Sequence, residues 1–343
     1  MNKKKIRLKD IADKLGISVN AVSLALNNKV GVSDETRMKV LTVADTLGYL
    51  DQFKDSDKKK HLNSICVMLE EKVFKDTRFY PKVILGIENE AKRNNYDTII
   101  NFIRRDKYDI PLSIERGKAE GILVLGYISD ENLKLLKSYK KPIVLVDYAS
   151  LSVVTGAVMT QNYTGAYMAT EYLIRCGHRN IGFIGDIKAA MSFYERWLGY
   201  NDALKQYNIP LENVCCITEN VEENVIQNNF QAFTEILKAL DRFPTAWFCA
   251  NDTTAFVFMN ALKFLGIKVP DDVSIIGFDD IDICSMTEPR LTTMHVEMEE
   301  MGATAVREIL LKVNNAYYIQ RHIRLPVRLV ERESVKLITG CQN

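Results

Sequence analysis

The sequence predicts an α/β protein that consists of a small all-α head and two doubly wound parallel-sheet subdomains. Residues 1–50 show short apolar stripes with helical spacing, whereas from residue 63 onward buried strands alternate with amphipathic helices. Such β-α-β alternation is typical of parallel sheets with helices on both faces. Residues 63–343 are too many for one such sheet, so we expect two similar halves with a cleft between them.

Three short helices are expected in the head. The first spans residues 8–15 and ends at Gly16, a residue that tolerates the left-handed backbone of a helix end. Ser18 is placed to cap a second helix that runs to about Leu26, and Ser33 is placed to cap a third that ends near Gly48.

The rest of the chain divides into a linker and a body. Residues 51–62 contain many lysines and aspartates and few apolar residues, which is typical of a linker. Apolar runs then predict buried strands, which we expect at residues 65–69, 98–103, 121–125, 142–146, 181–185, 246–250 and 273–278.

Composition and charge narrow the class of protein. No apolar run approaches the roughly 18 residues that a membrane span needs, and no apolar core of a signal peptide follows the basic start, so we expect a cytoplasmic protein without a membrane partner. Scattered cysteines and separated histidines predict neither a metal site nor a cofactor. Residues 1–60 hold 13 Lys and Arg against 8 Asp and Glu, and this basic head indicates a polyanionic partner.

Residues 8–26 carry the pattern of a helix-turn-helix. Ala12 is small where two helices must cross closely, Gly16 permits the tight turn, and Ile17 and Val22 fill the angle between the helices. A plain helical hairpin is the alternative, but the basic charge and the position in the chain favour DNA binding by the second helix.

With these motifs the chain resembles the lactose-repressor (LacI/GalR) family of bacterial regulators over nearly its whole length. The matching segments are Leu47-Gly48-Tyr49, Gly177-His178-Arg179, Asn251-Asp252, Gly277-Phe278-Asp279-Asp280, Pro289 to Thr293 and Arg332-Glu333-Ser334. The resemblance implies a ligand-responsive repressor that binds double-stranded, pseudo-palindromic operator DNA as a homodimer. It also implies a periplasmic-binding-protein-like body, with a small-molecule effector, expected to be a carbohydrate, in the cleft.

Such a body implies three chain crossings, which we expect near Gln161, Leu291 and Ile323. The domains expected from these crossings are the head (1–50), the linker (51–62), an N-terminal subdomain (63–161 and 292–323) and a C-terminal subdomain (162–291 and 324–343).

Candidate binding residues follow from position in this pattern. The residues expected to contact DNA are Lys9, Ser18, Val19, Asn20, Ala21, Ser23, Leu24, Asn27 and Lys29. Those expected to contact the effector are Phe79, Tyr80, Asp147, Ser192, Arg196, Asn251, Asp252 and Asp279, several of which follow strand ends. Alternatives stay open: Phe79 and Tyr80 could be ordinary core residues, Asp252 could cap a helix, and Leu24 could only pack against a neighbouring helix.

The chain departs from the family pattern at two places. The linker lacks the leucine that the family inserts into the minor groove, since Asp57 or Lys58 stands near that position. Asn224 stands about where sugar-responsive members keep an aromatic residue. The sequence motifs of serine hydrolases, P-loop proteins and zinc proteases are absent, so we do not expect an enzyme.

Overall fold

The computed structural model describes residues 6–26, 31–47, 49, 63–70, 78–104, 108–210, 216–240, 242–315 and 317–338. The chain divides into two compact units, Met1–Leu62 and Asn63–Asn343. The first contains the predicted head and linker, and the second is the α/β body. The linker itself and the predicted DNA contacts Asn27 and Lys29 lie outside the described residues.

The head is a three-helix unit around a small core. Its helices are α1 (Leu8–Leu15), α2 (Val19–Leu26) and α3 (Asp34–Thr46). Gly16 ends α1 with a φ of 63°, as its position predicts, and the Ser18 hydroxyl accepts the Ala21 amide at 3.1 Å at the start of α2. Ser33 caps α3 by accepting the amide of Thr36. Ala12 and Val22 are buried between the helices, which confirms their predicted packing role.

Parallel strands form the first sheet of the body, in the order β11-β5-β4-β3-β1-β2. These strands are β1 (Asn63–Glu70), β2 (Tyr96–Ile103), β3 (Ala119–Leu125), β4 (Ile143–Val146), β5 (Gly156–Thr160) and β11 (His322–Leu325). The helices of this lobe are α6 (Tyr80–Arg93), α7 (Leu112–Glu115), α8 (Asp130–Ser138) and α14 (Met298–Asn314). Helix α14 packs on α6 and along β3, β4 and β5.

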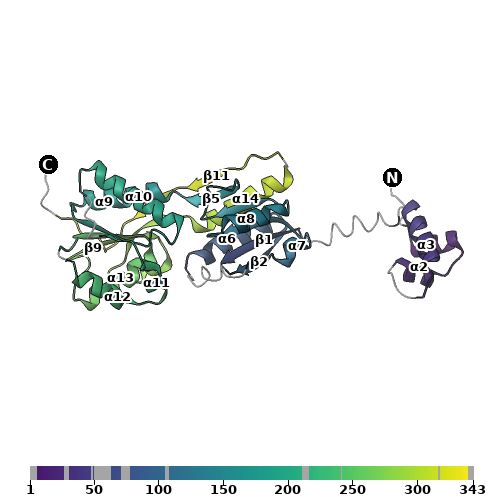
Figure 1. Ribbon diagram of the computed structural model, residues 1–343, viewed down its shortest axis with the longest axis horizontal. Coiled ribbons are helices and arrows are strands. Elements are labelled where there is room, and N and C mark those ends of the chain that lie inside the picture. The colour runs from purple at the N-terminus through teal and green to yellow at the C-terminus, as the bar shows by residue number, and fades with distance from the viewer. Residues whose placement is uncertain are drawn as a thin grey trace. The chain divides into compact units, whose positions relative to one another are not determined.

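The second sheet has the order β12-β10-β9-β8-β6-β7 and is parallel except for the edge strand β12. Its strands are β6 (Ile181–Ile184), β7 (Cys216–Ile217), β8 (Ala246–Cys249), β9 (Ser274–Asp279), β10 (Thr292–Val296) and β12 (Val327–Val330). Its helices are α9 (Asn162–Arg175), α10 (Met191–Gln206), α11 (Val221–Ile226), α12 (Phe230–Lys238), α13 (Asp252–Phe264) and the 3-10 turn η2 (Asp282–Ser285). Figure 1 shows the two sheets as two lobes of the body.

The chain passes between the lobes near residues 161, 297 and 326. Gln161 lies between β5 and α9, and Pro326 lies between β11 and β12, three residues after the expected Ile323. The crossing expected at Leu291 is wrong, because Thr292–Val296 pairs with β9 and belongs to the second sheet. The chain leaves this sheet only after Val296, and this correction moves residues 292–296 from the N-terminal to the C-terminal subdomain.

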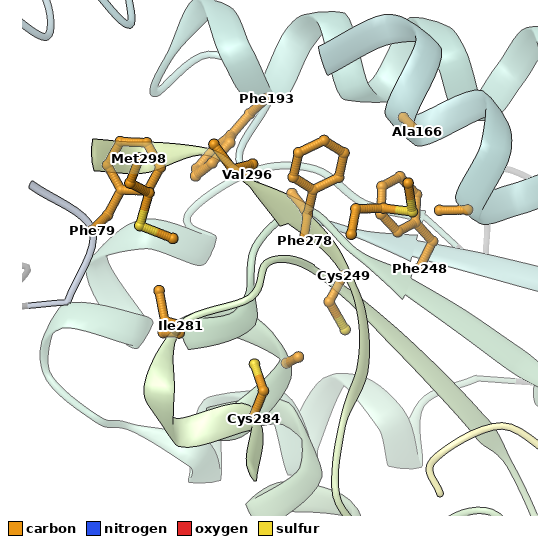
Figure 2. Close-up of a cluster of buried hydrophobic side chains, with 14 of the residues drawn as sticks. Phe79, Ala166, Phe193, Phe248, Cys249, Phe278, Ile281, Cys284, Val296 and Met298 are labelled. Carbon is orange, nitrogen blue, oxygen red and sulfur yellow. The ribbon is translucent and has the colours of Figure 1, made fainter. Parts of the chain in front are cut away.

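Both lobes contribute to one continuous core cluster. Phe79 and Met298 belong to it from the first lobe, and Phe193 and Phe278 from the second (Figure 2). Gly302 lets α14 approach α6 closely, since a Cβ there would lie 2.0 Å from the carbonyl oxygen of Val83. The predicted fold class is confirmed, and among the described residues we find no helix with the length and hydropathy of a membrane span.

Candidate functional site

A cavity of about 330 Å³ lies between the lobes, at the carboxyl ends of parallel strands. The first lobe lines it with residues at or just after the ends of β1, β3 and β4 and with Tyr80 of α6, and the second lobe with residues 187–191 and Tyr194. Ligands of parallel sheets usually bind at this end of the strands, because the loops there are free to carry polar groups. Its volume suits a small metabolite.

Tyr80 and Asp147 are the predicted effector residues that line this cavity. The Tyr80 hydroxyl donates to Oδ2 of Asp147 at 3.1 Å, whereas Oδ1 of Asp147 is buried without a hydrogen-bond partner. Burial raises the pKa of the Asp147 carboxyl to about 6. Asp147 also has a φ of 59°. Residues other than glycine that adopt such a strained backbone conformation are concentrated at functional sites. Asp147 therefore offers a ligand hydroxyl an unused acceptor.

Arg196 and Asp279 form a buried polar centre in the second lobe. Nη2 of Arg196 donates to Oδ1 of Asp279 at 2.9 Å, Nη1 to the carbonyl of Ala250 at 2.6 Å, and Nε to Oδ1 of Asn162 at 3.0 Å. The guanidinium also lies over the ring of Phe278, 3.8 Å from its centroid. Burial raises the pKa of Asp279, and the Arg196 charge opposes that rise. The two residues tie α9, β8, β9 and α10 together, and neither lines the cavity. Their contact with an effector stays a prediction.

Asn251 and Asp252 hold the start of α13 rather than the cavity wall. The Asn251 side chain caps the helix by accepting the amide of Thr254 at 2.8 Å. Asp252 is fully buried and accepts the Thr293 hydroxyl at 2.6 Å and the Ile281 amide at 3.1 Å. Asn251, and not Asp252, therefore caps α13 in this structure. Asp252 instead connects the loop after β9 to β10.

Ser192 and Phe79 are both buried close to the boundary between the lobes. Ser192 is in the first turn of α10, next to the cavity residue Met191. Phe79 packs edge-on against Tyr80, with 5.1 Å between the ring centroids, and belongs to the shared core. Phe79 is thus a core residue in this structure, which was the alternative to an effector contact. Tyr80 both belongs to the core and lines the cavity.

The sequence did not indicate the other ten lining residues of the cavity, six of which have large or charged side chains that could contact a ligand. These six are Glu70, Tyr127, Tyr148, Lys188, Met191 and Tyr194. Tyr127 and Tyr148 pack edge-on with centroids 5.4 Å apart. Glu70 ends β1 and Tyr127 closely follows β3, so the rule that selected Asp147 after β4 applies to them as well.

The head presents the second helix of its motif at the surface. Val19 is 43% exposed, Asn20 is exposed, and Ala21 and Ser23 are half-buried. Leu24 is half-buried, and a Cβ on residue 31 would lie 3.1 Å from its Cδ1, so part of Leu24 packs against the segment before α3. Lys9 of α1 is exposed. This exposed face, together with the capped start of α2, is compatible with docking in a major groove.

Comparison with known proteins identifies both units of the chain. A family model described as "Bacterial regulatory proteins, lacI family" matches residues 7–52, and one described as "Periplasmic binding protein-like domain" matches residues 170–335. The chain is 30% identical over 337 residues to the "HTH-type transcriptional repressor PurR" of Photobacterium profundum, covering 96% of this chain and 98% of that one. It is also 30% identical to the repressor of the same name from Vibrio vulnificus, over 96% and 99% of the two chains.

Solved structures share the fold. A LacI family transcriptional regulator from Enterococcus faecium with bound ribose superposes with a TM-score of 0.70 and 26% identity, over 81% of this chain and all of that one. The lac repressor dimer bound to operator and the anti-inducer ONPF superposes with a TM-score of 0.66 and 21% identity, over 97% and 100% of the two chains. These similarities cover both the head and the body.

Proposed function

The chain belongs to the lacI family of bacterial regulatory proteins, and from this we propose that it represses transcription as a homodimer on a pseudo-palindromic operator under the control of a carbohydrate effector. It is a DNA-binding transcriptional repressor and not an enzyme. Its place of action in our proposal is the cytoplasm, where bacterial operators are found.

The single observation that carries the effector proposal is the unpartnered Oδ1 of Asp147, a residue that lines the cavity between the lobes. A sugar hydroxyl can donate to this oxygen, and aromatic side chains in the same cavity can pack against the apolar face of a sugar ring. The tyrosines available for this packing are Tyr80, Tyr127, Tyr148 and Tyr194. The ribose bound to the Enterococcus faecium relative supports a small carbohydrate. Arg196 and Asp279 remain proposed contacts, reached if the lobes move relative to each other.

Both lobes supply walls of the cavity, so a bound effector favours the arrangement in which they are close together. An effector can shift DNA affinity only by its differential affinity for two arrangements of the protein. We propose that closure of the lobes is the change that the operator complex senses.

A thermal-shift screen of the full chain with pentoses, hexoses and disaccharides tests the effector proposal. A sugar that binds at 100 times its Kd stabilises the folded state by about 2.7 kcal/mol. Asp147→Asn should remove most of that stabilisation, whereas the exposed Asp271→Asn should keep it. If no sugar stabilises the wild type, or if Asp147→Asn responds normally, the carbohydrate proposal is wrong.

Exposed apolar side chains support the homodimer. The edge strand β2 exposes Ile100 and Phe102, and Leu112 of α7 is 59% exposed in the same lobe. In the second lobe Phe264 of α13 and Met286 are 64% and 78% exposed. Exposed apolar side chains on an edge strand are a liability unless a partner covers them.

Light scattering measures the oligomeric state directly. The wild type should be a dimer at micromolar concentration, and Phe102→Lys should shift it toward monomer because an ammonium group would be placed in the interface. Leu151→Lys, at a side chain that is 93% exposed outside these elements, serves as the matched control and should stay dimeric. A monomeric wild type or a stable tetramer contradicts the proposal.

A further inference from the structure

A second and larger cavity, of about 720 Å³, lies at the opposite end of the first sheet from the effector cavity. Glu120 at the start of β3, Pro142 just before β4 and Thr155 just before β5 line it. The effector cavity lies instead beyond the carboxyl ends of β1, β3 and β4. The two cavities are therefore separated by the length of the strands and can hold different molecules.

Four lysines line this second cavity: Lys137, Lys140, Lys141 and Lys312. The ammonium groups of Lys137 and Lys312 donate to main-chain carbonyls of the cavity wall, Val154 at 3.1 Å and Ile143 at 3.4 Å. Within the part of the chain that the structure describes, no carboxylate forms an ion pair with any of the four lysines. The described wall thus carries four lysines and one carboxylate, Glu120, and its net charge is positive.

The acidic groups close to the cavity already have other partners. Glu120 accepts the hydroxyl of Tyr96 at 2.8 Å, and Glu308 on α14 binds Arg321 and the Tyr318 hydroxyl. Burial lowers the pKa of Lys312 and the nearby charge of Lys137 lowers it further, whereas the Glu308 carboxylate raises it. An anion in the cavity would relieve this repulsion.

Thr155 supplies a polar group that no described residue of the chain satisfies. The residue is 3% exposed and lines the cavity, and its Oγ1 is buried without a hydrogen-bond partner. Buried hydroxyls almost always have partners in folded proteins, and a bound ligand is one way to supply the partner. Lys137 and Lys312 lie in the last turns of α8 and α14, where a positive charge interacts favourably with the helix dipole. That interaction explains neither why a cavity is present nor why the Thr155 hydroxyl has no hydrogen-bond partner.

We propose that this cavity, lined by Lys137, Lys140, Lys141, Lys312 and Thr155, binds the phosphate group of a small metabolite or free phosphate. Four cations match a dianion better than a single carboxylate, and phosphate carries about −1.5 to −2 charges at neutral pH. The volume exceeds that of orthophosphate and leaves room for the organic part of a phosphorylated metabolite. The site is independent of the carbohydrate proposed for the other cavity.

Calorimetric titration of the full chain without DNA tests this site. The probes are inorganic phosphate and glycerol 3-phosphate, with sodium chloride at matched ionic strength to measure general screening. We expect saturable binding of phosphate at one site per chain. Chloride at the same ionic strength should not abolish this binding. Tighter binding of glycerol 3-phosphate than of phosphate assigns the site to an organophosphate, and the reverse order assigns it to free phosphate.

Three variants locate the binding. Lys312→Met should weaken phosphate binding by about tenfold or more, since it removes a charged hydrogen bond. Thr155→Val removes the hydroxyl at almost unchanged volume, and it should weaken binding while leaving the melting temperature unchanged or higher. The exposed Lys205→Met on α10 is the matched control and should bind like wild type. Equal effects of chloride and phosphate, or unchanged affinity in both Lys312→Met and Thr155→Val, would overturn the proposal.

Discussion

Arg196 connects separate segments of the second lobe, and its replacement by methionine should destabilise the whole body. The guanidinium holds Asn162 at the start of α9, Ala250 after β8 and Asp279 at the end of β9. Methionine keeps much of the volume but leaves the Asp279 carboxylate buried without its cation. Breaking a buried ion pair by removing one partner costs about 3–5 kcal/mol. For a domain of this size that corresponds to a fall in Tm of roughly 6–10 °C.

Differential scanning calorimetry of the full chain measures this loss. Arg290→Met is the matched control, because Arg290 pairs with Glu333 at the surface, where the two side chains are 58% and 51% exposed. Exposed pairs contribute only about 0–1 kcal/mol, so the control should melt near the wild type. Adding Asp279→Asn to Arg196→Met should recover part of the stability, since the amide leaves no uncompensated charge.

Arg196 does not have this stabilising role if Arg196→Met melts no lower than Arg290→Met, or if Asp279→Asn lowers the melting temperature of Arg196→Met further. The large expected loss also affects tests of function. A missing effector response in an Arg196 variant identifies an effector contact only at a temperature where the variant is still folded.

Three further predictions concern the two binding functions. Operator affinity, measured by fluorescence anisotropy, should fall steeply with salt, with a log–log slope of about 0.9 per phosphate contact; a flat response would count against the head as the DNA-binding unit. We expect the wild type to prefer half-sites rich in A·T, and Leu24→Arg should create a guanine preference of about 1–3 kcal/mol at one half-site position. Selection of binding sites from random DNA measures both, and a guanine that the wild type already specifies at that position would contradict the expectation. Because burial raises the pKa of Asp147 to about 6 and a sugar hydroxyl needs the ionised carboxylate, sugar affinity should be constant well above pH 6 and decrease below it, approaching tenfold per pH unit. Calorimetry from pH 5 to 8 checks the last point, and a pH-independent affinity would show that Asp147 does not accept from the ligand.

Local sequence signals were sufficient for the head and for most strands of the body. In the head, Gly16 ends the first helix through its backbone freedom, and Ser18 and Ser33 cap the starts of the other two. Both effects act within a few residues. The buried strands β1, β3, β8 and β9 are runs of apolar residues whose burial on both faces follows from their composition. Asp147 could be selected because it directly follows such a run.

Strands whose identity depends on a distant partner were harder to predict. β10 contains Thr292, Thr293 and His295, so it lacks a continuous apolar run, and only its pairing with β9 and β12 assigns it to the second sheet. The boundary expected at Leu291 was wrong for this reason. β5, β7, β11 and β12 are also short, and no strand was predicted at any of them.

By itself, the sequence determined the class of the two units, the helix-turn-helix and the polar residues that follow strands, because these depend on periodicity and on neighbouring residues. Only the tertiary structure decided which of those polar residues face a cavity. Asp147 is left with a free acceptor there, whereas Arg196 and Asp252 are engaged by groups far away in the chain. The lysine-lined cavity was equally invisible, since Lys137 and Lys312 are brought together by the packing of α14 on β4 and β5. Hydrogen-bond partners and shared cavities are properties of pairs of distant segments, and no local pattern specifies them.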